Sequence, residues 1–271
     1  PYYRGIYNSA HQGVTITHNT IIADNHTNGA GLEIYTGHNL KEISFNTILS
    51  PIGAYGIGMD NCDNTINNRG RIYNNFISVG GTGIARGISI TGGCSYQDVS
   101  HNSVLVYSTN ATLANTAPLY LTSNANLRIY NNALKNDGLG YAVYANSNTS
   151  FISNNNAYHT HGGTIGHWNG GAVETTFTNW QTASTQDANA INIDPNFMSI
   201  SDLHTFLTLL NGAGIAGTGI WTDIDGQARD TVPDIGADEF DPLPLDDAGI
   251  FMYAGPSVPF AQGLKNVNLV L

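Results

Sequence analysis

A six-residue pattern recurs along the first half of the chain, and it constrains the fold more than any other feature. The clearest copy, residues 72–77, reads Ile-Tyr-Asn-Asn-Phe-Ile, with apolar residues three positions before and two positions after Asn75. The Asn residues of all copies form the series Asn19, Asn46, Asn75, Asn102, Asn132 and Asn155. Their spacing of 23 to 30 residues is typical of proteins built from stacked repeats.

A second segment follows each Asn at a similar offset and alternates apolar with polar residues. Its copies, and one earlier copy near the start of the chain, begin at Gly5, Gly31, Gly56, Gly87, Pro118 and Ala142. A period of two residues predicts half-buried β-strands, and no sustained helical period occurs in this half. We therefore predict an all-β solenoid whose coils stack about 4.8 Å apart.

The repeated Asn residues have a clear role in such a solenoid. Asn at the same place in successive coils can form a ladder of hydrogen bonds, and Asn tolerates the left-handed backbone of a sharp turn. The alternative is that these are ordinary turn residues. The flanking apolar residues repeat together with them, which favours the ladder.

The Ile-x-x-Asn-x-Ile pattern resembles that of right-handed parallel β-helix proteins of the pectin-lyase-like superfamily, over residues 5–240. The resemblance implies a right-handed parallel β-helix with an Asn ladder. Proteins of this kind include polysaccharide lyases, glycoside hydrolases, esterases, surface adhesins and phage tailspikes. The resemblance therefore specifies an architecture and leaves the function open.

Two motifs near the end extend the resemblance. Residues 223–229 read Asp-Ile-Asp-Gly-Gln-Ala-Arg and residues 234–239 read Asp-Ile-Gly-Ala-Asp-Glu, like the segment that closes many secreted bacterial β-helices. We expect Arg229 to pair with Asp234 or Glu239 and to hold a hairpin over the last coil. The alternative is a Ca²⁺ site at Asp223 and Asp225, although the spacing does not satisfy the full twelve-residue calcium loop.

These patterns divide the chain into four parts. We predict β-helix coils over residues 1–160, and irregular last coils with a C-terminal cap over 161–240, including a short helix near 175–183 that begins at Thr176 or Thr178. A Pro- and Asp-rich linker follows at 241–248, and 249–271 resembles the start of a β-sandwich domain. Because the chain opens mid-coil and ends in an apolar strand, we expect further domains in a longer protein.

Composition limits the possible partners. Nine Lys plus Arg against 20 Asp plus Glu, a net charge of −11, argues against nucleic-acid binding. The same charge disfavours a polyanionic substrate unless a local basic cluster overrides it. No apolar run of about 18 residues is present, so we expect no membrane insertion. Low charge and abundant polar residues fit a secreted or cell-surface protein that contacts a neutral polysaccharide or surface glycan.

Two cysteines, Cys62 and Cys94, end equivalent strands of successive coils. The spacing fits either a disulfide in a secreted protein or two buried free thiols.

The strands that begin at the Gly-Ile positions predict a binding surface. If Ile6, Leu32 and their equivalents point inward, the period of two residues turns tyrosines and carboxylates outward along one ribbon. The predicted binding residues are Tyr7, Glu33, Tyr35, Asp60, Tyr120 and Tyr144. A tyrosine ring can stack on a sugar while its hydroxyl stays hydrogen-bonded, although exposed tyrosines are also simply common in strands.

Two catalytic centres are conceivable. Glu33 and Asp60 lie one coil apart, so their carboxylates are expected about 6–9 Å from each other, which overlaps the range of inverting glycosidases. Arg69, Arg71 and Arg86, with Asp60 and Asp63 nearby, suggest a calcium-assisted lyase or a group of surface ion pairs.

The sequence thus predicts extracellular carbohydrate recognition by a β-helix within a larger secreted or cell-surface bacterial protein, with glycan cleavage left open. The alternative is a non-catalytic structural or adhesin stalk. A binding module should carry a groove walled by long turns, whereas a stalk should present a smooth ribbon.

Overall fold

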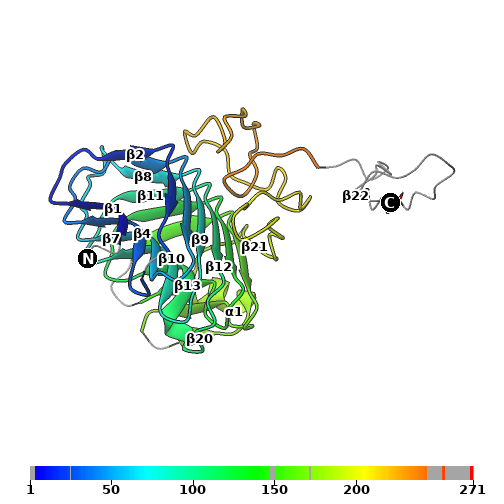
Figure 1. The fold of residues 1–271 in the computed structure, drawn as a ribbon, viewed down its shortest axis with the longest axis horizontal. Coiled ribbons are helices and arrows are strands. Elements are labelled where there is room, and N and C mark those ends of the chain that lie inside the picture. Colours follow the sequence, from blue (N-terminus) through cyan, green and yellow to red (C-terminus); the bar gives the residue numbers. More distant parts are fainter. Residues whose placement is uncertain are drawn as a thin grey trace, which may run out of the picture. The chain divides into compact units, whose positions relative to one another are not determined.

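The computed structural model describes residues 4–24, 26–146, 150–170 and 172–242, together with the strands at 252–253 and 269–270. The chain divides into one unit of Pro1–Phe240 and a second of Asp241–Leu271. The first unit is a solenoid in which six coils run through three parallel sheets in turn (Figure 1).

The first sheet contains β1 (Arg4–Ser9), β4 (Ala30–Tyr35), β7 (Tyr55–Asp60), β10 (Ala85–Thr91), β13 (Thr116–Leu121), β16 (Val143–Ala145), β19 (Gly166–Trp168) and the antiparallel β20 (Ala172–Glu174). The second sheet contains β2 (Thr15–Thr17), β5 (Glu42–Ser44), β8 (Gly70–Tyr73), β11 (Gln97–Ser100), β14 (Leu127–Tyr130) and β17 (Phe151–Asn154). The third sheet contains β3 (Thr20–Ile22), β6 (Thr47–Ser50), β9 (Phe76–Val79), β12 (Ser103–Val106), β15 (Ala133–Asn136), β18 (Ala157–Thr160) and β21 (Ile191–Asn192).

The core lies between the three sheets and consists of stacked aliphatic side chains. In the first sheet, Leu32 pairs with Ile57 on the next coil, and the series continues through Ile88 and Leu119. The equivalent inward residues of the other sheets are also buried, for example Ile72 and Ile77. Each coil buries its apolar face only when its neighbours are present, so stability comes from stacking.

The Asn ladder is present and runs through six coils. In each step the Asn side chain of one coil donates to the Asn carbonyl oxygen of the next, as between Asn75 and Asn102 at 2.9 Å. The sixth member is Asn156, because Asn132 donates to Asn156 Oδ1, so the prediction of Asn155 is wrong by one residue. Strand pairing explains the error: Ser153, not Ile152, is the inward partner of Ile129.

The left-handed conformation belongs to the residue before each ladder Asn. In the first four coils these residues have φ between 49° and 57°: His18, Phe45, Asn74 and His101. Asn131 and Asn155 continue the series at 58° and 52°. The ladder residues themselves supply hydrogen bonds, and their predecessors make the turn and project outward.

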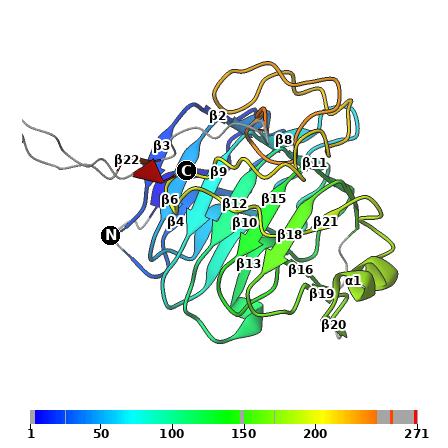
Figure 2. The same cartoon turned by 90° about the vertical axis from the view of Figure 1, so that its right-hand side faces the viewer.

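A short helix covers the last coil. Helix α1 (Phe177–Ser184) begins at Thr176, whose hydroxyl accepts a hydrogen bond from the Asn179 N–H, as the sequence predicts. Trp180 is fully buried on the last coil, and its indole N–H donates to Asp187. Asp187 also accepts a hydrogen bond from the side chain of Asn156, the last ladder Asn, at 3.3 Å. Figure 2 shows α1 beside β19 and β20.

Residues 194–240, called here the lateral segment, run back along the side of the solenoid (Figures 1 and 2). Leu203 and Ala237 pack on Phe76 and Leu105 of the third sheet. Arg229 pairs with Glu239 at 2.9 Å, as expected, and also donates to Asn74 Oδ1 at 2.9 Å. The Arg229 hairpin therefore lies against an interior coil at Asn74, and the prediction that it lies over the last coil is wrong.

Further features complete the description of the chain. Cys62 and Cys94 are buried free thiols, and the Cys62 N–H lies 3.1 Å from Cys94 Sγ. A 3₁₀ turn, Leu113–Asn115, precedes β13.

No helix among the described residues is long and apolar enough to cross a membrane. In the second unit, β22 (Met252–Tyr253) pairs antiparallel with β23 (Leu269–Val270), and most of the predicted linker and sandwich start lies outside the described residues.

Candidate functional site

The first sheet places the predicted binding residues in two outward rows. Tyr7 pairs with Glu33, and the row continues through Gly58 and Ser89 to Tyr120 and Tyr144. Tyr35 pairs with Asp60 in the second row. The predicted strand register is therefore confirmed.

Two of these tyrosines have no free ring face. The Tyr120 and Tyr144 rings stack at 4.4 Å, and His167 stacks on the other side of Tyr144 at 4.5 Å. The Arg86 guanidinium lies 3.4 Å from the centre of the Tyr120 ring. These rings are packed into a column along the sheet, so stacking of a sugar on Tyr120 or Tyr144 is excluded in this arrangement.

Tyr7 and Tyr35 remain about half exposed, at 44% and 45%. The guanidinium of Arg4 lies 4.6 Å from the centre of the Tyr7 ring. Neither tyrosine lines any of the cavities described below.

Glu33 and Asp60 do line one cavity, together with Tyr55, Ser89 and Thr91. Its volume is about 80 Å³, well below the roughly 300–1,000 Å³ of typical ligand pockets. Glu33 forms an ion pair with Arg4, and Asp60 accepts a hydrogen bond from the Thr91 hydroxyl at 2.8 Å. Both carboxylates line this cavity, but each already has a partner and the cavity is too small for a sugar ring.

The three arginines of the predicted lyase centre do not come together. Arg71 lies on β8 of the second sheet and Arg69 directly precedes that strand, whereas Arg86 lies on β10 of the first sheet. Arg69 pairs with Asp98 at 2.6 Å, and Arg71 donates to the Gly219 carbonyl at 3.0 Å. Residues close in sequence are separated here because one coil passes through different faces of the solenoid.

The predicted calcium residues also have separate roles. Asp223 is fully buried, and its carboxylate accepts N–H groups of Asp225, Gln227 and Glu239 at 2.7–3.1 Å. Asp223 thus caps its own turn with Oδ1 and holds Glu239 with Oδ2. Asp225 instead faces His204, with its Oδ2 2.7 Å from His204 Nε2.

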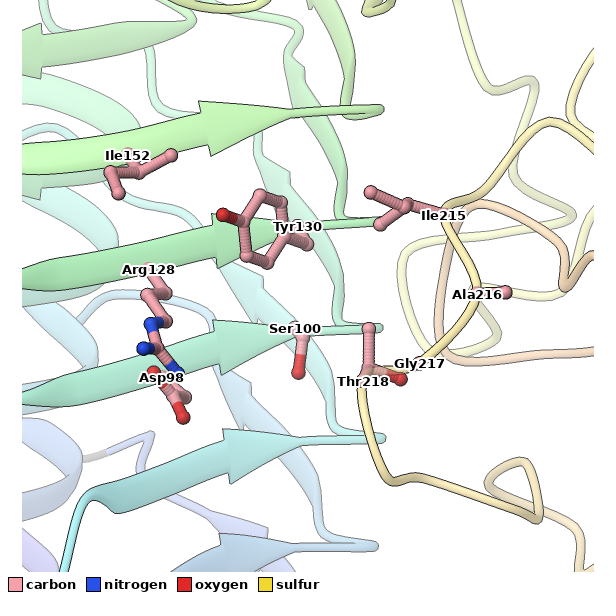
Figure 3. A pocket seen from close by; sticks show the side chains of 9 residues that line it. All are labelled: Asp98, Ser100, Arg128, Tyr130, Ile152, Ile215, Ala216, Gly217 and Thr218. Carbon is pink, nitrogen blue, oxygen red and sulfur yellow. The ribbon is translucent and has the colours of Figure 1, made fainter. Parts of the chain in front are cut away.

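A larger concave site lies on the second sheet (Figure 3). The strand register aligns Arg71, Asp98, Arg128 and Ile152 in one outward row. Ser100 and Tyr130 form the adjacent row. The second-sheet groove is a cavity of about 370 Å³ lined by Asp98, Ser100, Arg128, Tyr130, Ile152 and residues 215–218 of the lateral segment.

Two further cavities share lining residues with this one. A cavity of about 210 Å³ shares Arg128 and Ile152 with it and adds Arg69 and Tyr96. A third, of about 380 Å³, shares residues 216–218 and reaches Trp221. The first two share second-sheet residues and together make one depression across the coils, whereas the third is lined by the lateral segment alone.

The wall of the groove is held by the outward residues that precede the ladder Asn. Asn131 accepts from the Ile215 N–H at 2.7 Å and donates to the Ile215 carbonyl at 2.9 Å. The Thr218 hydroxyl lies 3.1 Å from His101 Nε2. Burial, with Arg229 nearby, holds the pKa of His101 well below its usual value, so this imidazole is neutral.

The electrostatics of the groove are mixed. Arg69 neutralises Asp98 on one side. Arg128 is exposed and, among the described residues, has no hydrogen-bond or ion-pair partner. Within the described part of the chain, the groove thus offers one unpaired cation, a half-buried tyrosine, hydroxyl groups and the apolar side chain of Ile152.

Sequence reasoning missed this groove for an identifiable reason. Inward and outward residues alternate in strands 127–130 and 151–154 as they do in the first sheet, so the sequence does not distinguish this sheet as the site. The wall, however, comes from residues 84 positions away from Asn131, and no periodic signal marks them.

Comparisons with known proteins agree with this architecture. A family model described as the right handed beta helix region matches residues 4–181, about two thirds of the chain. Searches of curated proteins and of solved structures returned no significant match. The coils, the three parallel sheets and this match together show that the chain belongs to the right-handed β-helix family.

Proposed function

We propose that this β-helix binds an extended carbohydrate chain in the second-sheet groove. The observation that carries the proposal is the shape of the site: two cavities that share Arg128 and Ile152 lie side by side across the coils of the second sheet, and residues 215–218 wall the larger one. An elongated groove suits a polymer, whereas a stalk would need no such feature.

The chemistry of the lining supports a sugar ligand. Tyr130 offers a ring and a hydroxyl, Ser100 and Thr218 offer hydroxyls, and Ile152 offers an apolar surface. Sugars present alternating hydroxyl groups and C–H faces, which match such a mixture. The low charge and net charge of −11 are in keeping with an extracellular site of action and with a mainly neutral glycan.

The test compares two surfaces with the same residue type. Tyr130→Ala and Arg128→Ala should weaken binding to a polysaccharide ligand about tenfold, equivalent to about 1.4 kcal/mol. Tyr35→Ala, on the open surface of the first sheet, is the matched control and should leave the affinity unchanged. Binding is measured by affinity electrophoresis against a panel of neutral and acidic polysaccharides, with assays for new reducing ends and unsaturated products.

The outcomes separate the alternatives. A loss of polysaccharide affinity in the Tyr35 variant, with the Tyr130 and Arg128 variants unchanged, would move recognition to the first sheet. Absence of binding across the panel would favour the structural stalk. New reducing ends that require Glu33 and Asp60 would assign glycosidase activity to the first-sheet pair.

A further inference from the structure

The lateral segment contains a cluster of metal-ligating side chains that is separate from the second-sheet groove. His204, Asp225 and Asp238 each offer one nitrogen or oxygen atom, and these atoms lie within 4.8 Å of one another. Asp225 Oδ2 is 2.7 Å and Asp238 Oδ1 is 4.0 Å from His204 Nε2. Two ligands bound to one tetrahedral ion at 2.0–2.1 Å are about 3.3 Å apart, so the observed separations bracket that of a site.

The imidazole is oriented as in known metal sites. Its Nδ1 faces the carboxylate of Asp202, so Nδ1–H can donate there and leave Nε2 for a ligand bond. Metal-bound histidines commonly use one ring nitrogen in this way to fix the tautomer. The ring also packs edge-on against Phe76 at 4.8 Å, which fixes its plane.

Asp238 supplies an independent observation. It is only 5% exposed, and among the described residues its carboxyl has one hydrogen-bond partner, the carboxyl group of Asp223, while His204 Nε2 lies 4.0 Å away. Its close neighbours are His204 and the carboxylates of Asp223 and Asp225. A buried carboxylate without a donor is costly unless it is neutralised or coordinates a cation.

A second cluster shows what a satisfied site of this kind looks like. Asp137, His159 and Asp194 lie equally close together, but Lys135 Nζ is 3.2 Å from Asp137 and 2.9 Å from Asp194. The lysine ammonium fills the position of a cation there. Neither Lys nor Arg forms an ion pair with Asp225 or Asp238 among the described residues.

We propose that His204, Asp225 and Asp238 bind one divalent transition-metal ion, with Asp202 orienting the imidazole. One imidazole nitrogen with carboxylate oxygens suits Zn²⁺ and its first-row neighbours better than Ca²⁺, which takes oxygen ligands almost alone. The ion ties together three stretches of the lateral segment, near residues 204, 225 and 238, against the third sheet. Its role is structural.

The experiment uses untagged, chelator-treated full chain and ZnCl₂ as the probe. Calorimetry should show one bound ion per chain, and Co²⁺ should give visible absorption bands that Zn²⁺ abolishes. His204→Gln and Asp225→Asn should each weaken binding at least tenfold and remove the rise in Tm that Zn²⁺ produces. Asp225 is exposed and contacts only His204 in this cluster, so its variant should fold.

Asp194→Asn in the lysine-filled cluster is the control and should bind Zn²⁺ as the unaltered chain does. The proposal is overturned if the unaltered chain binds no Zn²⁺, if both His204→Gln and Asp225→Asn retain its affinity, or if Asp194→Asn loses as much affinity as they do.

Discussion

Single residues of one type have distinct roles in this solenoid. Three consecutive asparagines illustrate the point: Asn154 accepts from the Asn189 N–H, Asn155 donates to the Ala213 carbonyl, and Asn156 ends the ladder. Their roles depend on which side of the turn each faces. An Asn in a solenoid can therefore stabilise the interior, the turn or the packing of a distant segment.

The interior ladder residues should be the most sensitive to substitution. Asn102→Ala removes the acceptor for the N–H and side chain of Asn75 and the donor to the Ile72 carbonyl, all of them buried. Leaving such groups unpaired should lower the free energy of unfolding by about 2–4 kcal/mol. Urea denaturation measures this.

Asn19→Ala is the control for that variant. Asn19 begins the ladder, is only partly buried and donates without accepting from another ladder residue. Its substitution should cost clearly less. Equal losses at both positions would show that the ladder contributes no more inside than at its end.

At the scale of elements, α1 protects the last coil. Without it, the apolar interior next to β19 would face solvent or another chain. Trp180 packs closely on Gly166, where even one added carbon atom would meet its ring at 2.5 Å.

Trp180→Ala should therefore lower the free energy of unfolding by about 3–5 kcal/mol, since a large buried side chain is lost. It should also promote association through the exposed end, seen by analytical ultracentrifugation. Trp221→Ala is the matched control, because Trp221 is 79% exposed. If Trp180→Ala remains monomeric and as stable as Trp221→Ala, α1 is not a protective cap.

At the scale of the whole molecule, the lateral segment joins distant coils and should make stability depend on pH. Burial raises the pKa of Asp234 to about 6, although hydrogen bonds from Phe240 and Gly212 oppose the rise. The unfolded-state pKa is about 3.9. The folded chain then binds the proton more tightly, so this group's stabilising contribution is present below about pH 4 and is lost as the pH rises to about 6.

Asp234→Asn should reduce the decline in unfolding free energy between about pH 4 and pH 6, measured by denaturation at several pH values. Asp24→Asn, at an exposed carboxylate, should keep the full decline. An unchanged decline in the Asp234 variant would show that this carboxyl does not control the pH dependence.

The repeat, the core and the first-sheet register could be predicted from the sequence, because each depends on periods that a local segment carries by itself. Alternation of apolar and polar residues predicts that Ile6, Leu32 and Ile57 point inward. Short motifs predict the helix cap at Thr176 and the ion pair of Arg229. The sixth ladder position was predicted at Asn155 instead of Asn156 because three adjacent asparagines fit the motif equally well.

Only the tertiary structure decided where the lateral segment lies. The contact of Arg229 with Asn74 spans 155 positions, and that of Ile215 with Asn131 spans 84. Such contacts follow from the packing of a complete solenoid surface, which no short pattern encodes. The second-sheet groove and the His204 cluster both form where the lateral segment folds back, and for that physical reason neither was predicted from the sequence.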